Sequence, residues 1–426
     1  MEKKTCPELR FKGFDQDWSI ILLGNLMNVG SVKRVHQADW CDTGVRFLRA
    51  RDIVAFAKNE DIADPIYISQ DRYEEYSKLS GKVKVGDLLV TGVGTIGIPL
   101  LVKKDDPLYF KDGNVIWFKN DNVINGLFLY YSFINDITQN FIRDSSGIGT
   151  VGTYTITSGK QTPIYLPKEN EQAQIGHFFE NLDQSIALHE KKLAQTQNLK
   201  KAMLEKMFPK VGSKQPEIRL KGFSGDWELS YLDNILESLP NNTLSRADLN
   251  YSKGEIKSIH YGDILIKYGV IIDCEVDEIP FITDCQIADF KSHKLKNGDI
   301  IFADTAEDDA VGKAVELRDI NDLFIVSGLH TMAYRPKIKL SPNYLGYYLN
   351  TQSYRRQLSV LMQGVKVLSI SKKNLSKTQV LYPSSEQEQQ KIGEYFKTLD
   401  QTLTLRQQQL QTLKKLKQAF LEKMFV

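Results

Sequence analysis

The sequence predicts an α+β protein in which two mixed α/β domains are joined by two long helices that form an antiparallel coiled coil. Three observations lead to this fold class: the chain is internally duplicated, each copy ends in a long segment without proline, and short strand patterns fill the middle of each copy. The predicted domains are residues 1–168 and 211–384. The predicted helical regions are residues 169–210 and 385–426.

The duplication is clearest in the closing segments. EQAQIGHFFENLDQSIALHEKKLAQTQNLKKAMLEKMF (171–208) aligns without a gap with EQQKIGEYFKTLDQTLTLRQQQLQTLKKLKQAFLEKMF (388–425), and 18 of 38 positions are identical. PELRFKGFDQDW (7–18) and PEIRLKGFSGDW (216–227) open the two copies, at an offset of 209. VGDLLV (85–90) resembles NGDIIF further along, at an offset of 212, but otherwise the middles hardly match. The chain therefore repeats one plan with two different middles.

The closing segments are predicted to be continuous helices. Residues 171–208 contain no proline, and Pro209 follows at once as a stop. Apolar residues recur at alternating steps of four and three, which is the 3.5-residue spacing of a coiled coil. These seam residues are Ile175, Phe179, Leu182 and Ile186 in the first helix and Ile392, Phe396, Leu399 and Leu403 in the second.

Equivalent helices pair through equivalent faces, so we expect antiparallel association about a pseudo-twofold axis, with the two domains at opposite ends. We also expect six seam residues to be buried, namely Phe179, Leu182, Ile186, Phe396, Leu399 and Leu403.

The middles are predicted to be mixed α/β domains. Short apolar runs bounded by turn residues indicate strands at GDLLVTG, GIPLLV and NVIWF in the first middle and at HYGDILIKYG, GDIIFAD and FIVSGL in the second. Helices are predicted within residues 126–142 and 343–358.

Catalytic motifs can be tested against this pattern. GVGTIG (92–97) fits G-x-G-x-x-G, but a strand pattern follows it where a nucleotide site needs a helix, so a glycine-rich hairpin loop is expected. DPIY (64–67) lacks the second proline of the amino-methyltransferase signature. No P-loop, HExxH, GxSxG or metal-ligand cluster occurs. The sequence therefore predicts a chain that is not an enzyme and binds no cofactor and no metal.

Composition restricts the setting. The net charge of +2 gives no global basic field, and four cysteines without CxxC spacing are expected to be free thiols in a reducing compartment. No apolar run approaches the length of a membrane span, so no membrane association and a cytoplasmic location are expected.

The repeated EQ..IG start and LEKMF end of the helices, the PELRFKGF opening and the GDLLV hairpin together resemble the specificity (S) subunit of bacterial type I restriction–modification systems. The resemblance covers nearly the whole chain. It implies two target-recognition domains, each reading half of a bipartite site in double-stranded DNA. It also implies that the helical regions dock two methyltransferase subunits, that two restriction subunits can join, and that the S subunit holds neither S-adenosylmethionine nor ATP.

DNA contacts are expected in polar loops, because bases are read by Arg, Lys, Asn, Gln, Ser and Thr, and phosphates attract Lys and Arg. In the first domain the candidates lie in SVKRVHQ (31–37) and RDSSGIGT (143–150), and they are Lys33, Arg34, His36, Arg143 and Ser146. In the second they are Asn241, Arg246, Lys267 and Lys366. For each residue the alternative is a solvated surface loop.

Two other functions stay open. One is a structural coiled-coil adapter between two proteins that does not read DNA, and the other is a single-chain enzyme, which the missing motifs oppose. The sequence does not indicate the bases read, the spacer length, or whether the system restricts DNA or only methylates it.

Overall fold

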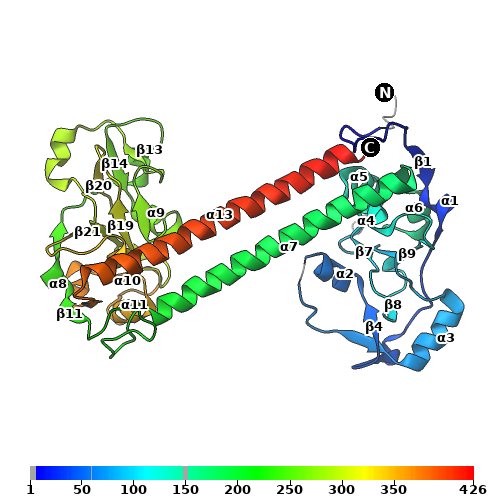
Figure 1. Cartoon of the computed structure of the whole chain (residues 1–426), viewed down its shortest axis with the longest axis horizontal. Helices are drawn as coiled ribbons and strands as arrows, with labels where there is room; N and C mark the ends of the chain where they lie inside the picture. Colours follow the sequence, from blue (N-terminus) through cyan, green and yellow to red (C-terminus); the bar gives the residue numbers. More distant parts are fainter. Residues whose placement is uncertain (1–5, 59, 147–151) are drawn as a thin grey trace. The chain divides into compact units, whose positions relative to one another are not determined.

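The protein forms two compact units (Figure 1). Each unit contains one mixed α/β domain, which we call a head, and parts of two long helices. The structure is a computed structural model that describes residues 6–58, 60–146 and 152–426. Unit 1 comprises Met1–Glu190 with Gln408–Val426, and unit 2 comprises Lys191–Gln407. The long helices are α7 (Glu169–Lys206) and α13 (Glu386–Met424), close to their predicted limits.

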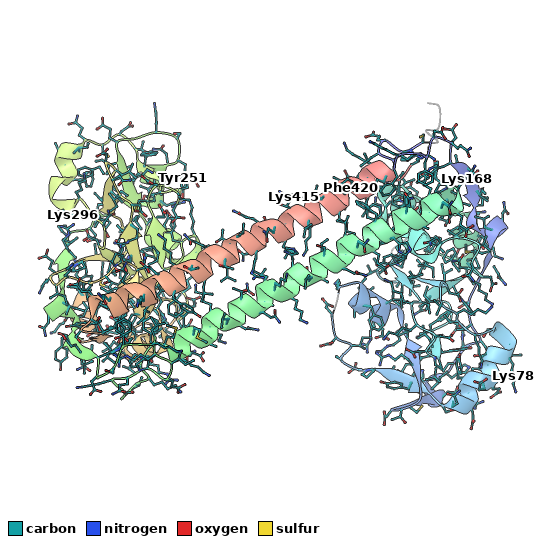
Figure 2. All side chains as sticks on the ribbon, viewed as in Figure 1. Lys78, Lys168, Tyr251, Lys296, Lys415 and Phe420 are labelled. Atoms are coloured by element: carbon teal, nitrogen blue, oxygen red, sulfur yellow. The ribbon has the colours of Figure 1, made fainter. Side chains whose placement is uncertain are left out.

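The helices pair antiparallel in each unit. In unit 1 the start of α7 meets the end of α13. The ring of Phe178 lies 5.1 Å from that of Phe420, the residue labelled in Figure 2, and Lys417 lies 2.6 Å from Asp183. In unit 2 the end of α7 meets the start of α13, where Phe208 stacks on Phe396 at 5.6 Å. The predicted antiparallel pairing is confirmed.

The predicted burial of the seam was partly wrong. Of the six residues expected to be buried, Phe179 and Phe396 are buried, whereas Leu182, Ile186, Leu399 and Leu403 are only half-buried. Phe179 and Phe396, like Ile175 and Ile392, owe their burial largely to the heads, because they belong to the head cores. Leu182 and Leu399 only border those cores, and two helices alone cannot cover a seam residue on all sides.

The first head contains two four-stranded sheets, ordered β2-β9-β6-β7 and β3-β5-β4-β8. Its strands are β1 (Ser19–Leu22), β2 (Asn28–Gly30), β3 (Trp40–Cys41), β4 (Val45–Leu48), β5 (Ile66–Ile68), β6 (Leu88–Thr91), β7 (Pro99–Leu101), β8 (Leu108–Phe110), β9 (Val115–Lys119) and β10 (Pro163–Leu166). Its helices are α1 (Leu23–Leu26), η1 (Gln37–Asp39), α2 (Ala50–Ala57), α3 (Gln70–Ser80), α4 (Gly126–Ile134), α5 (Asp136–Ser145) and α6 (Ile156–Gln161).

The second head has sheets ordered β12-β21-β17-β19-β15 and β13-β16-β14-β20. Its strands are β11 (Glu228–Tyr231), β12 (Leu236–Leu239), β13 (Leu249–Asn250), β14 (Ile256–Ile259), β15 (Ile271–Asp273), β16 (Phe281–Ile282), β17 (Ile300–Ala303), β18 (Thr305–Ala306), β19 (Ala314–Arg318), β20 (Phe324–Ser327), β21 (Thr331–Pro336), β22 (Leu368–Ser369) and β23 (Gln379–Tyr382). Its helices are α8 (Leu232–Ile235), η2 (Arg246–Asp248), α9 (Tyr261–Ile266), η3 (Ile287–His293), α10 (Tyr344–Tyr348), α11 (Gln352–Ser359) and α12 (Lys372–Leu375).

The two middles therefore share one core topology although their sequences hardly match, and the second head adds β15 and the pair β18-β22. The order β2-β9-β6-β7 corresponds strand by strand to β12-β21-β17-β19, and β3-β5-β4-β8 to β13-β16-β14-β20. In both heads the second sheet contains one parallel pair, β4 with β8 and β14 with β20. The duplication extends through the whole chain.

The central strands are buried on both faces, which explains their unbroken apolar runs. In β6, Leu88 faces the core that contains α4 and the helix ends, and Leu89 faces the core beneath the second sheet. The segment at 92–97 is the loop between antiparallel β6 and β7, so the expected hairpin is confirmed.

One predicted strand was wrong. Residues 260–269 begin with helix α9, because the ring of His260 caps it by accepting a hydrogen bond from the Gly262 amide at 3.2 Å. The helix then directs Ile264 into the core. The six residues of α9 fit either the helical or the strand period, and the cap decides between them.

The repeated motifs attach each helix to its head. Arg10 of the opening segment donates two hydrogen bonds, at 2.6 and 2.8 Å, to the buried carboxylate of Glu171 in the first turn of α7. Arg219 and Glu388 repeat this pair at 2.8 Å in unit 2. The glycine of EQ..IG is needed because a Cβ on Gly176 would lie 2.8 Å from the Leu127 side chain. The motifs recur because both junctions are built alike.

The aspartate of the LDQ motif connects three elements. The Tyr131 hydroxyl donates to Asp183 at 2.7 Å, and Lys417 of α13 pairs with the same carboxylate. In unit 2, Tyr347 donates to Asp400 at 2.7 Å, and Lys200 of α7 pairs with it. Each aspartate therefore holds a head and the opposite helix together.

Candidate nucleic-acid interface

Polar and cationic side chains gather at the same place in both heads, where the parallel strands end. In the first head β4 and β8 end at Leu48 and Phe110, and α2 begins immediately after β4. In the second head β14 is the parallel partner of β20, and α9 begins just after β14. Loops that follow neighbouring parallel strands converge, so these ends can present several side chains to one ligand.

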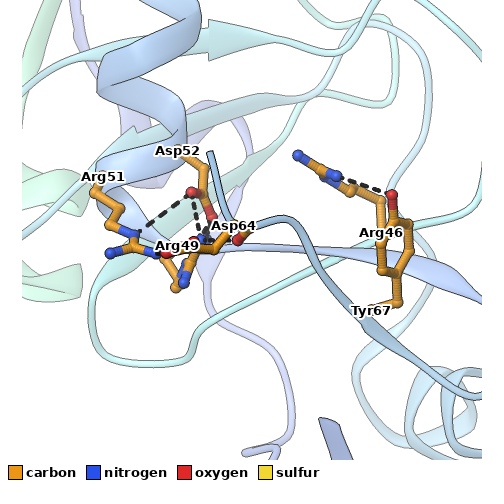
Figure 3. Close-up of polar contacts among 6 residues, drawn as sticks. All are labelled: Arg46, Arg49, Arg51, Asp52, Asp64 and Tyr67. Carbon is orange, nitrogen blue, oxygen red and sulfur yellow. Dashed lines mark hydrogen bonds and ion pairs between the residues drawn. The ribbon is translucent and has the colours of Figure 1, made fainter. Parts of the chain in front are cut away.

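In the first head the cluster is made of arginines held by aspartates (Figure 3). Arg49 donates to both oxygens of the buried Asp52 at 2.9 Å and to the Asp64 carbonyl at 2.6 Å. Arg51 reaches the Asp64 carboxylate at 2.8 Å and remains more than half exposed. Asp64, the first residue of DPIY, therefore positions arginines. Nearby, Arg34 pairs with Asp112, just beyond β8, at 2.8 Å.

A cation lies over an aromatic ring at the same register position of each head. Arg46 on β4 faces Tyr67 on β5, with 5.3 Å from guanidinium to ring centroid and a 3.2 Å hydrogen bond to the hydroxyl (Figure 3). Lys257 on β14 faces Phe281 on β16 at 5.4 Å. The arrangement has persisted although all four residue types differ.

In the second head the corresponding cluster surrounds Tyr251 (labelled in Figure 2). Arg246 donates to Asp263 at 2.6 Å and to the Tyr251 hydroxyl at 2.7 Å. The Lys267 ammonium lies 4.6 Å from the ring centroid and pairs with Glu278 at 2.9 Å. Asp263 is the third residue of α9, as Asp52 is of α2, so an equivalent aspartate holds an arginine in both heads.

Two histidines extend this surface. The ring of Tyr261 lies 4.6 Å from His260 and 5.3 Å from His330, and His330 contacts the Asp304 carboxylate at 3.2 Å. Burial lowers the pKa of the His260 imidazole, which agrees with its role as a hydrogen-bond acceptor at the α9 cap. Burial raises the pKa of the Asp304 carboxyl, and nearby His330 opposes that rise. The surface thus offers both donors and acceptors.

The residues predicted to contact DNA in the first head lie in different places, and not all of them are exposed. Lys33 and His36 are exposed, and Arg34 joins the strand-end site. Arg143 is exposed near the end of α5, where it bonds to Asn140. Ser146 is buried and donates to the Ile142 carbonyl, so its hydroxyl is already engaged. The rest of that predicted loop, 147–150, lies outside the described residues.

In the second head, Arg246 and Lys267 are brought together around Tyr251. Asn241 donates to the Gly328 carbonyl at 3.4 Å, beside the end of β20, and Lys366 is exposed on a separate hairpin. Whether these side chains touch DNA stays a prediction.

The sequence patterns missed Arg49, Arg51 and His260. A signal was present, because FLRARDI (47–53) aligns with SIHYGDI (258–264) at an offset of 211, between the offsets of the flanking matches. The aspartates and the following isoleucines coincide in that alignment.

A family model for the type I restriction modification DNA specificity domain matches residues 17–198 and again residues 224–415. The chain belongs to this family. Each match covers one copy of the duplication, and the predicted resemblance is confirmed. Members of the family are the specificity components of type I restriction–modification systems, which recognise DNA sequence and are not themselves catalytic.

Individual relatives agree. The chain is 20% identical over 306 residues to the type I restriction enzyme MjaVIII specificity subunit of Methanocaldococcus jannaschii, covering 70% of this chain and 68% of that protein. The MjaX specificity subunit of the same organism is 25% identical over 204 residues, and the match spans 47% of this chain and 45% of that protein. The Haemophilus influenzae specificity subunit S.HindORF215P is 28% identical over 177 residues, 43% of its length. The chain thus spans less than half of two of these relatives.

Solved structures share the fold. An S subunit from M. genitalium aligns over 99% of both chains with a TM-score of 0.56 and 15% identity. A chain from a type I R-M system, solved in work on complex assembly and conformational transition, aligns over 97% of this chain and 99% of its own with a TM-score of 0.55 and 18% identity. At these identities the likeness concerns the fold alone.

Among the residues that the structure describes, no helix is both long and apolar enough to cross a membrane. Within the same residues, no group of three or more His, Cys, Asp and Glu side chains is placed to hold a metal ion.

Proposed function

We propose that this chain reads a bipartite site in double-stranded DNA, one half with each head, and fixes the spacing of the halves through α7 and α13. The observation that carries the proposal is the pair of strand-end sites. They occupy equivalent places in the two heads, yet Arg49 and Arg51 stand in one where His260 and Gly262 stand in the other. Equivalent position with different chemistry suits two readers of different sequences.

The same helices dock two methyltransferase subunits in this proposal. Leu188 and Leu405 occupy equivalent positions 217 residues apart, as do Leu199 and Leu416, and all four are exposed. Unit 1 thus exposes Leu188 and Leu416, and unit 2 exposes Leu199 and Leu405. Two equal exposed surfaces favour two copies of one partner. Restriction subunits, as the family resemblance implies, join the resulting complex.

In vitro selection from random duplexes tests the proposal, with the lone chain and with its complex with methyltransferase subunits. We expect the complex to select two short motifs separated by a constant spacer. The net charge of +2 supplies little phosphate attraction, so we expect weak and poorly selective binding by the lone chain. A complex that assembles but selects no sequence would favour the structural adapter instead.

A salt titration distinguishes residues that contact phosphates from residues that contact bases. Replacing Lys33 and Arg34 together with glutamine should flatten the dependence of log K on log salt by up to about two units, because each lost phosphate contact removes roughly 0.9. The selected motif should not change. Lys78→Gln, on α3 (Figure 2), is the matched control and should leave the slope as it is.

A further inference from the structure

The second head contains a hairpin, residues 360–369, that is hydrogen-bonded at its base and exposed at its tip. We call it the valine hairpin. At its base Gln363 and Ser369 exchange backbone hydrogen bonds at 2.9 and 2.8 Å, and β22 pairs with β18. The tip needs a glycine, since Gly364 has a φ of +122° and a Cβ there would lie 2.0 Å from the Val367 carbonyl oxygen. The turn is therefore tightly determined.

The valine hairpin exposes apolar side chains at its tip and at Val360, where it leaves α11. Val365 is 99% exposed, Val360 81% and Val367 54%. Single exposed apolar residues are common on protein surfaces, but three within eight residues of one hairpin form a cluster of the kind found at binding surfaces. Nothing among the described residues covers Val365, which leaves it available to a binding partner.

The charge around the hairpin indicates what that partner is. From Leu323 to Ser385 the chain contains nine Lys and Arg and no Asp or Glu, whereas the corresponding residues 107–168 of the first head contain four acidic residues. Seven of the nine form no ion pair among the residues that the structure describes. Lys337 and Arg355 donate to backbone carbonyls, and the other five are exposed, namely Arg356, Lys366, Lys372, Lys373 and Lys377. This segment supplies exposed cations and no carboxylate of its own; the acidic residues nearby lie on the β18 segment, where Asp304 interacts with Lys372. An excess of exposed cations favours a polyanion over an apolar protein surface.

We infer that the valine hairpin enters the major groove of DNA, with Val365 against the C5-methyl group of a thymine and Lys366 on a flanking phosphate. The major groove, about 12 Å wide, admits a two-stranded ribbon, whereas the minor groove is only about 6 Å wide. The thymine methyl is the apolar group that the major groove presents. This inference rests on the proposed function and assigns part of the sequence reading by the second head to Val365.

The test combines a change in the protein with a change in the DNA. Using the complex with methyltransferase subunits and its selected duplex, each thymine is replaced in turn by uracil, which lacks the methyl group. At one position, in one half-site only, binding by the unmodified chain should weaken about fourfold, since a buried methyl group contributes about 0.8 kcal/mol and 1.4 kcal/mol is a factor of ten. In Val365→Ala the effect of uracil at that position should disappear.

Controls make each outcome decisive. Val276→Ala alters another exposed valine of the second head, outside the hairpin, and should keep the full uracil effect. Lys366→Gln should weaken binding to selected and scrambled duplexes alike. Equal uracil effects in the unmodified chain and in Val365→Ala would overturn the inference, as would half-sites without thymine. So would a Val365→Ala variant that loses methyltransferase subunits instead. A complex that selects no sequence at all would refute the proposed function itself.

Discussion

The buried ion pair at the junction of α13 with the second head permits a quantitative test. Glu388 is buried and accepts two hydrogen bonds from Arg219 at 2.8 Å, whereas Glu386, two residues earlier in the same helical turn, forms an exposed pair with Lys339 at 2.7 Å. In Glu388→Gln the guanidinium keeps one of its two acceptors at residue 388 and the Gly225 carbonyl, and it lies mostly buried without its counter-charge. Breaking a buried pair from one side costs about 3–5 kcal/mol, and losing an exposed pair costs about 0–1 kcal/mol.

Differential scanning calorimetry of both variants measures the difference. For domains of this size 1 kcal/mol moves the midpoint by about 2–4 °C, so Glu388→Gln should lower the midpoint of the affected transition by at least about 6 °C. Glu386→Gln should leave it nearly unchanged. Adding Arg219→Met to Glu388→Gln should recover part of the loss, because the buried charge is then gone. Equal small shifts in the two single variants, or no recovery in the double variant, would refute the assigned role of the pair.

Two further outcomes are expected. Phe425→Ala should destabilise unit 1 by about 3–5 kcal/mol in urea unfolding, because the ring fills the first head's core beside Trp18. Leu416 is exposed, so Leu416→Ala should cost under about 0.5 kcal/mol. Similar losses in the two variants would contradict this account of the helix end. Burial raises the pKa of the Cys274 thiol to about 12, so this thiol stays protonated at pH 8 and should react with a thiol reagent only on unfolding. The partly exposed Cys41 should react in the native protein. Labelling is followed by mass spectrometry, and fast labelling of Cys274 would show that its site is open.

The long helices could be predicted because their pattern is local. Thirty-eight residues with one period and no proline leave little choice of structure, and the duplication supplied a second, independent copy. Burial along the seam depends on more than period. Phe179 is covered by Tyr131 and Phe425, which lie on other elements, and no periodicity in α7 reports them.

The common topology of the heads could not be predicted from the divergent middles. Many different sequences form the same set of short buried strands, so two domains can share a topology with little sequence identity. The strand-end sites were found only in part for a related reason. Arg34 and Arg246 stood out in polar loops, but Arg49 and Arg51 lie in an apolar context. Asp64, which both contact, is 15 and 13 positions away, so these contacts exist only in the folded chain.

Exchange of one head tests the central claim most directly. Residues 19–165 are replaced by the equivalent head of another family member, and the motif bound by the complex with methyltransferase subunits is determined by selection before and after. Because each head carries its own core and its own strand-end site, we expect one half of the motif to change while the other half and the spacer persist. A change in both halves, or in the spacer, would contradict the account of two independent readers held by α7 and α13.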